Sequence, residues 1–428
     1  MRYKERDVYS WIIFLIWPFF MFVYSFKDFF HKNSQRIFLA FSFLYGYSVF
    51  ISSGDITRYE DAFYHMRTLT WDQFFWLLTN FWTDKNDIYF ELNLTASKPD
   101  IYALTSTFIV GRFTENPRWF WGIISVIYTY LILNFINTIA NETNIYKNLF
   151  NQKVFLFGLI LIIPFYYGIT GVRFWPALFI YVTYALQYLS TKKNKFIFIA
   201  GLSIFFHYSF LLPFFLLIVT AFLPNNRSFY KMMVIGGIFI SVVSSVSSSL
   251  TTVENITSVF EETAIDDSTS SYTDEGALEI KKEKFSNVNW YVQLRNSSVL
   301  YFLIILALFD VFGLFGFKEN KFLITTYPLM VIFLTLTLLT IELGSLARFR
   351  FVFYILILSR YVILCGLQPN NKILNSIALF FVPFLTFYTI IVFRGGFYTV
   401  DPLLLINNAF LTFFINSDVS LSEFLVGH

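Results

Sequence analysis

Residues 196–223 read FIFIAGLSIFFHYSFLLPFFLLIVTAFL, an apolar stretch of 28 residues with no full charge and one histidine, His207. As a single helix it would be about 42 Å long, well beyond the roughly 30 Å hydrocarbon core of a bilayer. Basic residues flank both ends, and positive charge favours the cytoplasmic side of a membrane. They are Lys192, Lys193 and Lys195 before the stretch and Arg227 and Lys231 after it. The stretch is therefore predicted to enter the membrane, turn near His207 and return as a re-entrant hairpin.

Composition places the whole chain in a membrane. Of its 428 residues, 56% are hydrophobic and 14% are charged, and the mean hydropathy is +0.60. A soluble domain carries about 25% charged residues. Apolar runs long enough to span a bilayer recur from end to end, so residues 1–428 are predicted to form one all-α polytopic integral membrane domain. The small net charge of +3 gives no reason to expect a nucleic-acid partner.

Loop charges predict the orientation. Two long polar loops, 54–100 and 251–297, are rich in acids, and the first holds eight acids against four bases. Short basic loops favour the cytoplasm, so the two long loops are predicted to be external. The short basic connectors are 27–36, 191–195, 224–231, 317–321 and 368–372. With segment 100–113 as a short interfacial or re-entrant piece, the count is about 10–12 transmembrane or re-entrant helices.

The first external loop also carries aromatic residues at near-helical spacing. Trp71, Phe74, Phe75, Leu78 and Trp82 would line one side of a helix. Two interpretations stay open, an amphipathic helix lying on the membrane face and an ordinary aromatic anchor at the interface.

Four groups of reactive side chains converge on the external face under this topology. Arginines suit bidentate recognition of phosphate or pyrophosphate, so five residues are predicted to bind substrate. These are Arg58, Tyr59, Arg173, Arg348 and Arg350. A carboxylate or an imidazole nearby can take a proton from a hydroxyl group, which makes Asp55 and His207 the candidate catalytic residues. Together they are suited to a lipid pyrophosphate at the outer leaflet.

Each candidate also has a structural interpretation. Arg173 would be a snorkelling anchor, His207 a hydrogen-bonded turn residue and Asp55 a helix cap, while the late arginines would pair with Glu342. Arg360 lies inside a predicted span and must face a partner or a cavity. No histidine pair has metal-ligand spacing and no glycine loop suits a phosphate, so neither a metal nor a cofactor is expected.

The same motifs resemble the EpsG-like group of Wzy-type polysaccharide polymerases. The matching features are Asp55-x-x-x-Tyr59, Arg173 with Lys192-Lys193, Ala200 to Phe206-His207-Tyr208-Ser209, and Arg348-Phe-Arg350 before an aromatic span. Two positions depart from the pattern. Phe174 stands where glutamine usually follows the arginine, and a carboxyl-terminal Pro-Tyr pair is replaced by Pro402-Leu403.

This resemblance implies a glycosyltransferase-C-like fold and an enzyme of the bacterial plasma (inner) membrane. It would join undecaprenyl-pyrophosphate-linked oligosaccharide repeat units into O-antigen or capsular polysaccharide at the external face. On that basis Arg173, with Arg348 or Arg350, would stabilise the pyrophosphate, and Asp55 or His207 would orient or deprotonate the acceptor hydroxyl. Membrane lipid is an expected partner, as are a chain-length regulator and a flippase of the same pathway.

Two other classes compete with this interpretation. A lipid-linked oligosaccharide flippase or other transporter would need no catalytic base, and transporters tend to show paired repeats with broken helices at corresponding positions. Here the two long loops are unrelated and one hairpin carries a histidine, which favours an enzyme. A membrane O-acetyltransferase would need an acyl-donor site that the sequence does not show.

Overall fold

The computed structural model describes most of the chain. The described residues are 3–50, 55–80, 100–143, 150–162, 167–224, 226–246, 290–314, 320–340, 346–415, 417 and 419–426. Regular secondary structure within these ranges is helical throughout. Much of the two predicted external loops, and Glu342, lie outside them.

The α-helices follow one another along the chain, with short 3-10 turns between some of them. They are α1 (Tyr3–Ile16), α2 (Pro18–Ser25), α3 (Lys32–Tyr47), α4 (Asp55–Thr68), α5 (Trp71–Thr79), α7 (Ile101–Phe113), α8 (Arg118–Asn141), α9 (Phe150–Ile162), α10 (Tyr167–Thr170), α11 (Phe174–Thr191), α12 (Asn194–Gly201), α13 (Ser203–Phe206), α14 (Leu211–Phe222), α15 (Arg227–Val246), α19 (Trp290–Phe312), α20 (Lys321–Leu339), α21 (Arg350–Leu367), α22 (Lys372–Gly396) and α23 (Leu421–Val426). The 3-10 turns are η1 (Phe26–Asp28), η3 (Tyr208–Phe210), η4 (Leu346–Phe349), η5 (Pro402–Leu405) and η6 (Leu411–Phe413).

Several of these helices suit a bilayer. Among the described residues, α8, α20, α21 and α22 are long and apolar enough to cross a membrane, and several shorter helices are also apolar. An apolar helix satisfies its own backbone hydrogen bonds, which is the condition for entering hydrocarbon. The all-α polytopic membrane class predicted from the sequence is confirmed, while the number of spans stays a prediction.

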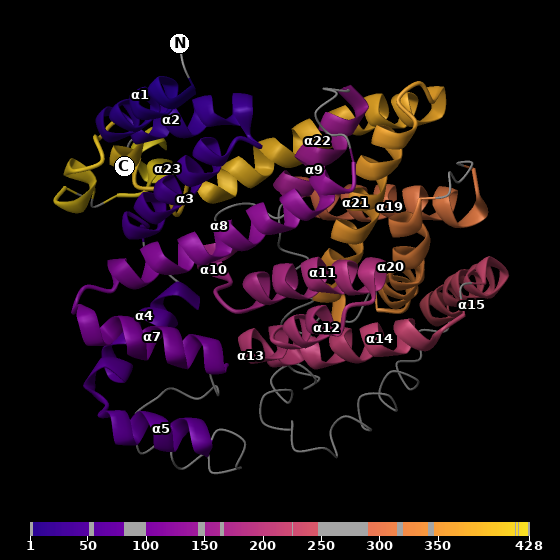
Figure 1. Cartoon of the computed structure of the whole chain (residues 1–428), viewed down its shortest axis with the longest axis horizontal. Coiled ribbons are helices and arrows are strands. Elements are labelled where there is room, and N and C mark those ends of the chain that lie inside the picture. The colour runs from indigo at the N-terminus through magenta and orange to yellow at the C-terminus, as the bar shows by residue number, and fades with distance from the viewer. Residues whose placement is uncertain are drawn as a thin grey trace.

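The helices form two main packing groups, joined by α8 (Figure 1). The larger apolar core is built from α8, α9, α11 and α19–α22 with the arms of the 196–223 stretch. The smaller core gathers α1–α4 and the carboxyl-terminal segment, so both ends of the chain lie in the same region. A third cluster joins α4, α5 and α7, where the Phe74 and Phe108 rings stack 3.9 Å apart. Helix α5 buries Phe74 and exposes Trp71, Phe75 and Trp76. Whether this exposed aromatic side lies on the membrane face stays a prediction.

Helices α3 and α8 approach closely at Gly46. A methyl group added at Gly46 would lie 2.3 Å from the Trp121 carbonyl oxygen and 2.7 Å from Ser125 Cβ. Small residues permit this kind of backbone contact between helices in membranes. The α3–α8 contact fixes the smaller group against the helix that leads into the larger one.

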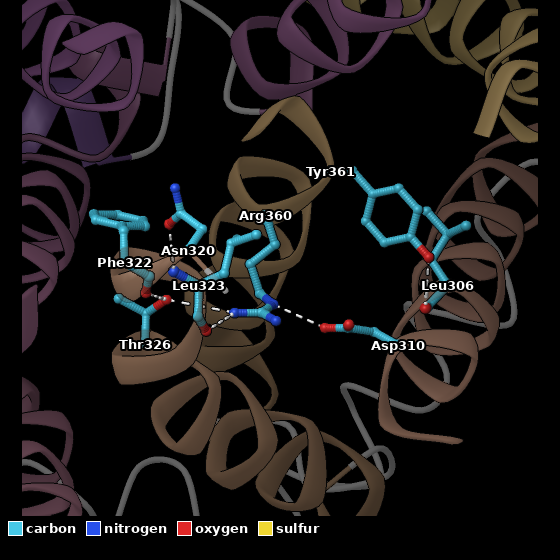
Figure 2. A network of polar contacts seen from close by, with 8 residues as sticks. All are labelled: Leu306, Asp310, Asn320, Phe322, Leu323, Thr326, Arg360 and Tyr361. Carbon is cyan, nitrogen blue, oxygen red and sulfur yellow. Dashed lines mark hydrogen bonds and ion pairs between the residues drawn. The ribbon is translucent and has the colours of Figure 1, made fainter. Parts of the chain in front are cut away.

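A buried ion pair joins α19, α20 and α21, as Figure 2 shows. Arg360 Nε donates to Asp310 Oδ2 at 2.8 Å, and Arg360 Nη1 donates to the Leu323 carbonyl at 2.6 Å. Tyr361 donates to the Leu306 carbonyl at 2.9 Å beside them. The expectation that Arg360 faces a partner is thus met by Asp310, whose side chain is fully buried.

Residues 196–223 fold as two helical arms around His207. Helices α12 and α13 form the first arm, and η3 with α14 forms the second. Lys192 ends α11 in the left-handed conformation, with φ at 58°, which reverses the chain into the first arm. His207 itself has extended backbone dihedrals and breaks the helix between the arms. Whether this hairpin is re-entrant in a bilayer stays a prediction.

Candidate functional site

Asp100 lies where three segments meet. It is the N-cap residue of α7, but its side chain makes no capping hydrogen bond and points elsewhere. Oδ1 accepts a hydrogen bond of 3.0 Å from the Tyr208 backbone N–H, at the tip of the hairpin. Oδ2 lies 3.0 Å from Arg173 Nη1, at the head of α11. One carboxylate therefore connects α7, α11 and the hairpin, and its side chain is only 11% exposed.

Arg173 is placed by the start of α11. It is the residue that precedes the helix, and Pro176 follows within the first turn, where proline has no helical hydrogen bond to lose. Its guanidinium carbon lies 5.9 Å from the centre of the Tyr59 ring on α4. The side chain is 25% exposed, so it is held by Asp100 and Tyr59 yet accessible from outside.

His207 connects the hairpin to Arg348. Its Nδ1 lies 3.0 Å from Ser209 Oγ, and its Nε2 lies 3.4 Å from Arg348 Nη1. The Ser209 backbone N–H donates to Nδ1 at 3.3 Å, and a guanidinium only donates hydrogen bonds, so both ring nitrogens face donors. A doubly protonated imidazole would set two cations against each other. The arrangement therefore favours a neutral His207 that orients Arg348.

Aromatic rings enclose this side of the site. Phe174 packs edge-on to His207 with centres 5.7 Å apart, and the Arg348 guanidinium carbon lies 6.0 Å from the Phe174 ring. Phe210 and Phe349 are buried behind Phe174. An apolar wall lowers the local dielectric constant, which strengthens every charge interaction in front of it.

Electrostatics link Asp100 to both arginines. Burial raises the pKa of Asp100 above its usual range, while the charges of Arg173 and Arg348 and the Tyr208 N–H oppose that rise. Burial is the larger effect, because it removes water from the carboxylate. The site thus combines two cations and one carboxylate that holds a proton more readily than a carboxylate in water.

The structure brings together four of the residues predicted from the sequence. They are Tyr59, Arg173, His207 and Arg348. Arg350 begins α21, near them in sequence; its guanidinium lies 5.6 Å from the Phe351 ring, and its Nε has no hydrogen-bond partner among the described residues. The side chains of Asp55 and Arg58 lie outside the described part of the structure.

Asp100 is the site residue that the sequence reasoning missed. It is one of eight acids in the first long loop, and the composition of that loop does not distinguish it from the others. Its position was nevertheless visible, because it directly precedes the apolar segment 101–113, where a carboxylate commonly caps a helix. Within the described residues no group of three His, Cys, Asp or Glu side chains is arranged to hold a metal ion.

Comparison with known proteins agrees with the motifs. The family model described as "EpsG family" matches residues 37–400, which includes every residue of the site described above. No curated protein and no solved structure matches the chain. The family consists of Wzy-type polymerases, which indicates a polysaccharide polymerase-type function on a lipid-linked sugar substrate in a membrane. The match covers most of the chain, and the chain therefore belongs to the EpsG family.

Proposed function

We propose that this protein joins undecaprenyl-pyrophosphate-linked oligosaccharide repeat units into O-antigen or capsular polysaccharide at the external face of the bacterial plasma membrane. One observation carries the proposal: Arg173 and Arg348 flank the same buried group of side chains, through Asp100 and His207 respectively. Two guanidinium groups suit a pyrophosphate, which presents several anionic oxygens at once.

The reaction is a displacement at a sugar carbon. The growing chain on one lipid carrier is the donor, and the non-reducing sugar of a second lipid-linked unit is the acceptor. An acceptor oxygen bonds to the anomeric carbon of the donor, whose bond to the pyrophosphate oxygen breaks. The pyrophosphate leaves with the electron pair and gains one negative charge, so stabilising that charge is the main catalytic task.

The side chains have distinct tasks in this reaction. Arg173 and Arg348 bind the pyrophosphate, and Arg350 and Arg58 are proposed to extend that cationic surface. Tyr59 contacts Arg173 through its ring and limits the directions in which the guanidinium turns. His207 orients Arg348, and Asp55 remains a candidate for orienting the acceptor hydroxyl.

Charge in the loops supports the external location of the site. Asp100 and Tyr59 come from the acid-rich segment 54–100, whereas the connector after α11 carries Lys192 and Lys193. Basic loops favour the cytoplasm, so the head of α11 with Arg173 would lie on the opposite face. Lipid-linked repeat units presented at the outer leaflet would meet the arginines there.

A surface-polysaccharide gel tests the proposal. A deletion strain is complemented with the wild-type chain, with Arg173→Ala or with Arg36→Ala, a matched arginine that is exposed on α3. We expect the wild type and Arg36→Ala to restore long chains. Arg173→Ala should leave single repeat units on the lipid carrier or on the lipid A core. Full-length polymer in the deletion strain itself would contradict the proposal.

The rival flippase gives a different result in the same gel. A flippase delivers the repeat unit to the external leaflet, so its loss removes even the single unit from the cell surface. Absence of single units in the deletion strain would therefore favour transport and overturn the polymerase proposal.

A further inference from the structure

Asp100 is the carboxylate in the site whose chemistry the proposed function leaves unused. It is buried, with 8% of the residue exposed, and it touches the cation that would receive the pyrophosphate. Its two oxygens have different environments. Oδ1 accepts a hydrogen bond from the Tyr208 N–H, whereas Oδ2 accepts no hydrogen bond within the described structure.

The contact between Asp100 and Arg173 is electrostatic. Arg173 Nη1 lies 3.0 Å from Oδ2 and forms an ion pair with it. The carboxylate therefore lies where an anionic phosphate oxygen would also bind Arg173. The oxygen that faces Arg173, Oδ2, accepts no hydrogen bond within the described structure.

His207 is less suited to accept a proton in this arrangement. Its Nδ1 already accepts from the Ser209 N–H at 3.3 Å, its Nε2 lies 3.4 Å from Arg348 Nη1, and protonation would place a second cation beside that arginine. Protonation of Asp100 has the opposite effect, because it removes a negative charge that competes with the pyrophosphate for the two arginines.

We propose that Asp100 is the general base of the reaction, and that the incoming pyrophosphate uncovers it by taking Arg173 away. This inference rests on the proposed function. In the empty site Asp100 holds Arg173. When the donor pyrophosphate binds, Arg173 turns to it, and Asp100 Oδ2 opens towards the acceptor hydroxyl. Donor binding therefore precedes activation of the acceptor.

The proton and the charge balance in this step. The acceptor O–H bond breaks and its proton goes to Asp100 Oδ2, while the acceptor oxygen bonds to the anomeric carbon of the donor. The bond from that carbon to the pyrophosphate oxygen breaks, and the pyrophosphate leaves with the electron pair. The leaving group gains one negative charge as Asp100 loses one, so the total charge facing the arginines is unchanged. The raised pKa of Asp100 helps, because a more basic carboxylate takes the proton more readily.

The test uses the full chain in proteoliposomes that contain lipid-linked repeat units from a polymerase-deficient strain. Chain elongation is followed as a function of pH, and binding of undecaprenyl pyrophosphate is measured separately. The variants are Asp100→Asn and, as a control, Asp401→Asn. Asp401 is a buried carboxylate that also accepts from backbone N–H groups, those of Leu403 and Ser417, which do not belong to this site.

We expect Asp100→Asn to slow elongation by roughly 10²- to 10⁴-fold, the usual contribution of a general base. It should bind undecaprenyl pyrophosphate as tightly as the wild type or more tightly, because a competitor for Arg173 is gone. Asp401→Asn should match the wild type in both assays per folded molecule.

Two results would overturn this inference and leave the proposed function standing. One is elongation by Asp100→Asn at the wild-type rate. The other is a loss of undecaprenyl pyrophosphate binding as large as the loss of elongation, since that would make Asp100 a support for Arg173 only. If the wild type itself lengthens no chain, the proposed function fails as well.

Discussion

Arg173 Nη1 and Asp100 Oδ2 lie 3.0 Å apart, and this contact joins the head of α11 to the start of α7. The same carboxylate accepts the backbone N–H of Tyr208, so the position of the hairpin tip depends on it too. The proposed leaving-group cation and the proposed base are thereby held in one place. The pair is buried on the Asp100 side and open on the Arg173 side, which suits a contact that a substrate replaces.

Replacement of Arg173 tests the leaving-group role. Arg173→Ala should reduce elongation by about 10²- to 10³-fold, the usual cost of removing one group that stabilises a developing anion. Arg173→Lys should recover part of the rate, because an ammonium keeps the charge but loses the planar fork. Initial rates with purified protein measure both. Equal rates for the lysine and alanine variants would exclude a role for the positive charge.

His207 is expected to act through Arg348. His207→Gln places an amide oxygen near the position of Nε2 and keeps an acceptor for Arg348, whereas His207→Ala removes it. A hydrogen bond to a charged group contributes about 1.5–3 kcal/mol, so the alanine variant should lose on the order of ten- to hundredfold in rate and the glutamine variant less. His65→Ala, at an exposed position on α4, is the control. Equal loss in both His207 variants would instead identify His207 as a base.

Acid pH should inhibit elongation through Asp100. The base must be ionised, and its pKa is raised, so activity should fall as the pH drops through a value above the ordinary range of an aspartate. Asp100→Asn should retain its small residual rate without this acidic limb. A pH–rate profile of both proteins measures the difference, and an identical acidic limb in the variant would assign it to another group.

The raised pKa of Asp100 also predicts how this residue affects the stability of the fold. A carboxyl whose pKa is higher in the folded protein than in the unfolded chain disfavours folding when it is ionised. Asparagine resembles the protonated form, so at neutral pH Asp100→Asn should unfold at the wild-type temperature or above it. Thermal unfolding in detergent checks this, and a clear loss of stability would show that the carboxylate mainly supports the fold.

The Arg360–Asp310 pair should show strong coupling. Removing one partner leaves a buried charge unpaired, which costs about 3–5 kcal/mol, so Arg360→Met and Asp310→Leu should each destabilise the protein strongly. The double variant should be far more stable than the sum of the two effects predicts. Glu115→Ala breaks the exposed contact with Arg67 and should change stability by less than about 1 kcal/mol. Additive effects at Arg360 and Asp310 would contradict the buried pair.

Two glycines give a steric test of the α3–α8 contact. Gly46→Ala places a methyl group against the Trp121 carbonyl, a backbone atom that cannot move aside, so we expect loss of folded protein. Gly236→Ala on α15 meets nothing within 4 Å and should be neutral or stabilising by about 0.5–1 kcal/mol, because alanine favours a helix. Tolerance of Gly46→Ala would mean that the two helices are further apart.

Hydrophobic runs and motif order made much of the fold and part of the site predictable. The all-α membrane class follows from the length of the apolar runs. The charges of the loops place Arg173, His207 and Arg348 on one face, which predicts that they converge. Asp100 is not predictable as a site residue, because the residues around it in the sequence do not distinguish it from the solvated acids of the same loop. Its role depends on the tertiary contact with Tyr208, and a single sequence carries no signal for such a pairing. Asp310 was likewise missed, because the partner of Arg360 lies 50 positions away.

The most direct test of the central claim is a product analysis with the wild-type chain alone in proteoliposomes that contain undecaprenyl-pyrophosphate-linked repeat units. Lipid-linked glycans and released carrier lipid are quantified together by mass spectrometry. We predict glycans lengthened by whole repeat units, with one undecaprenyl pyrophosphate released for each new linkage. Repeat units that keep their original length, whether they stay in place or cross the bilayer, would contradict the account.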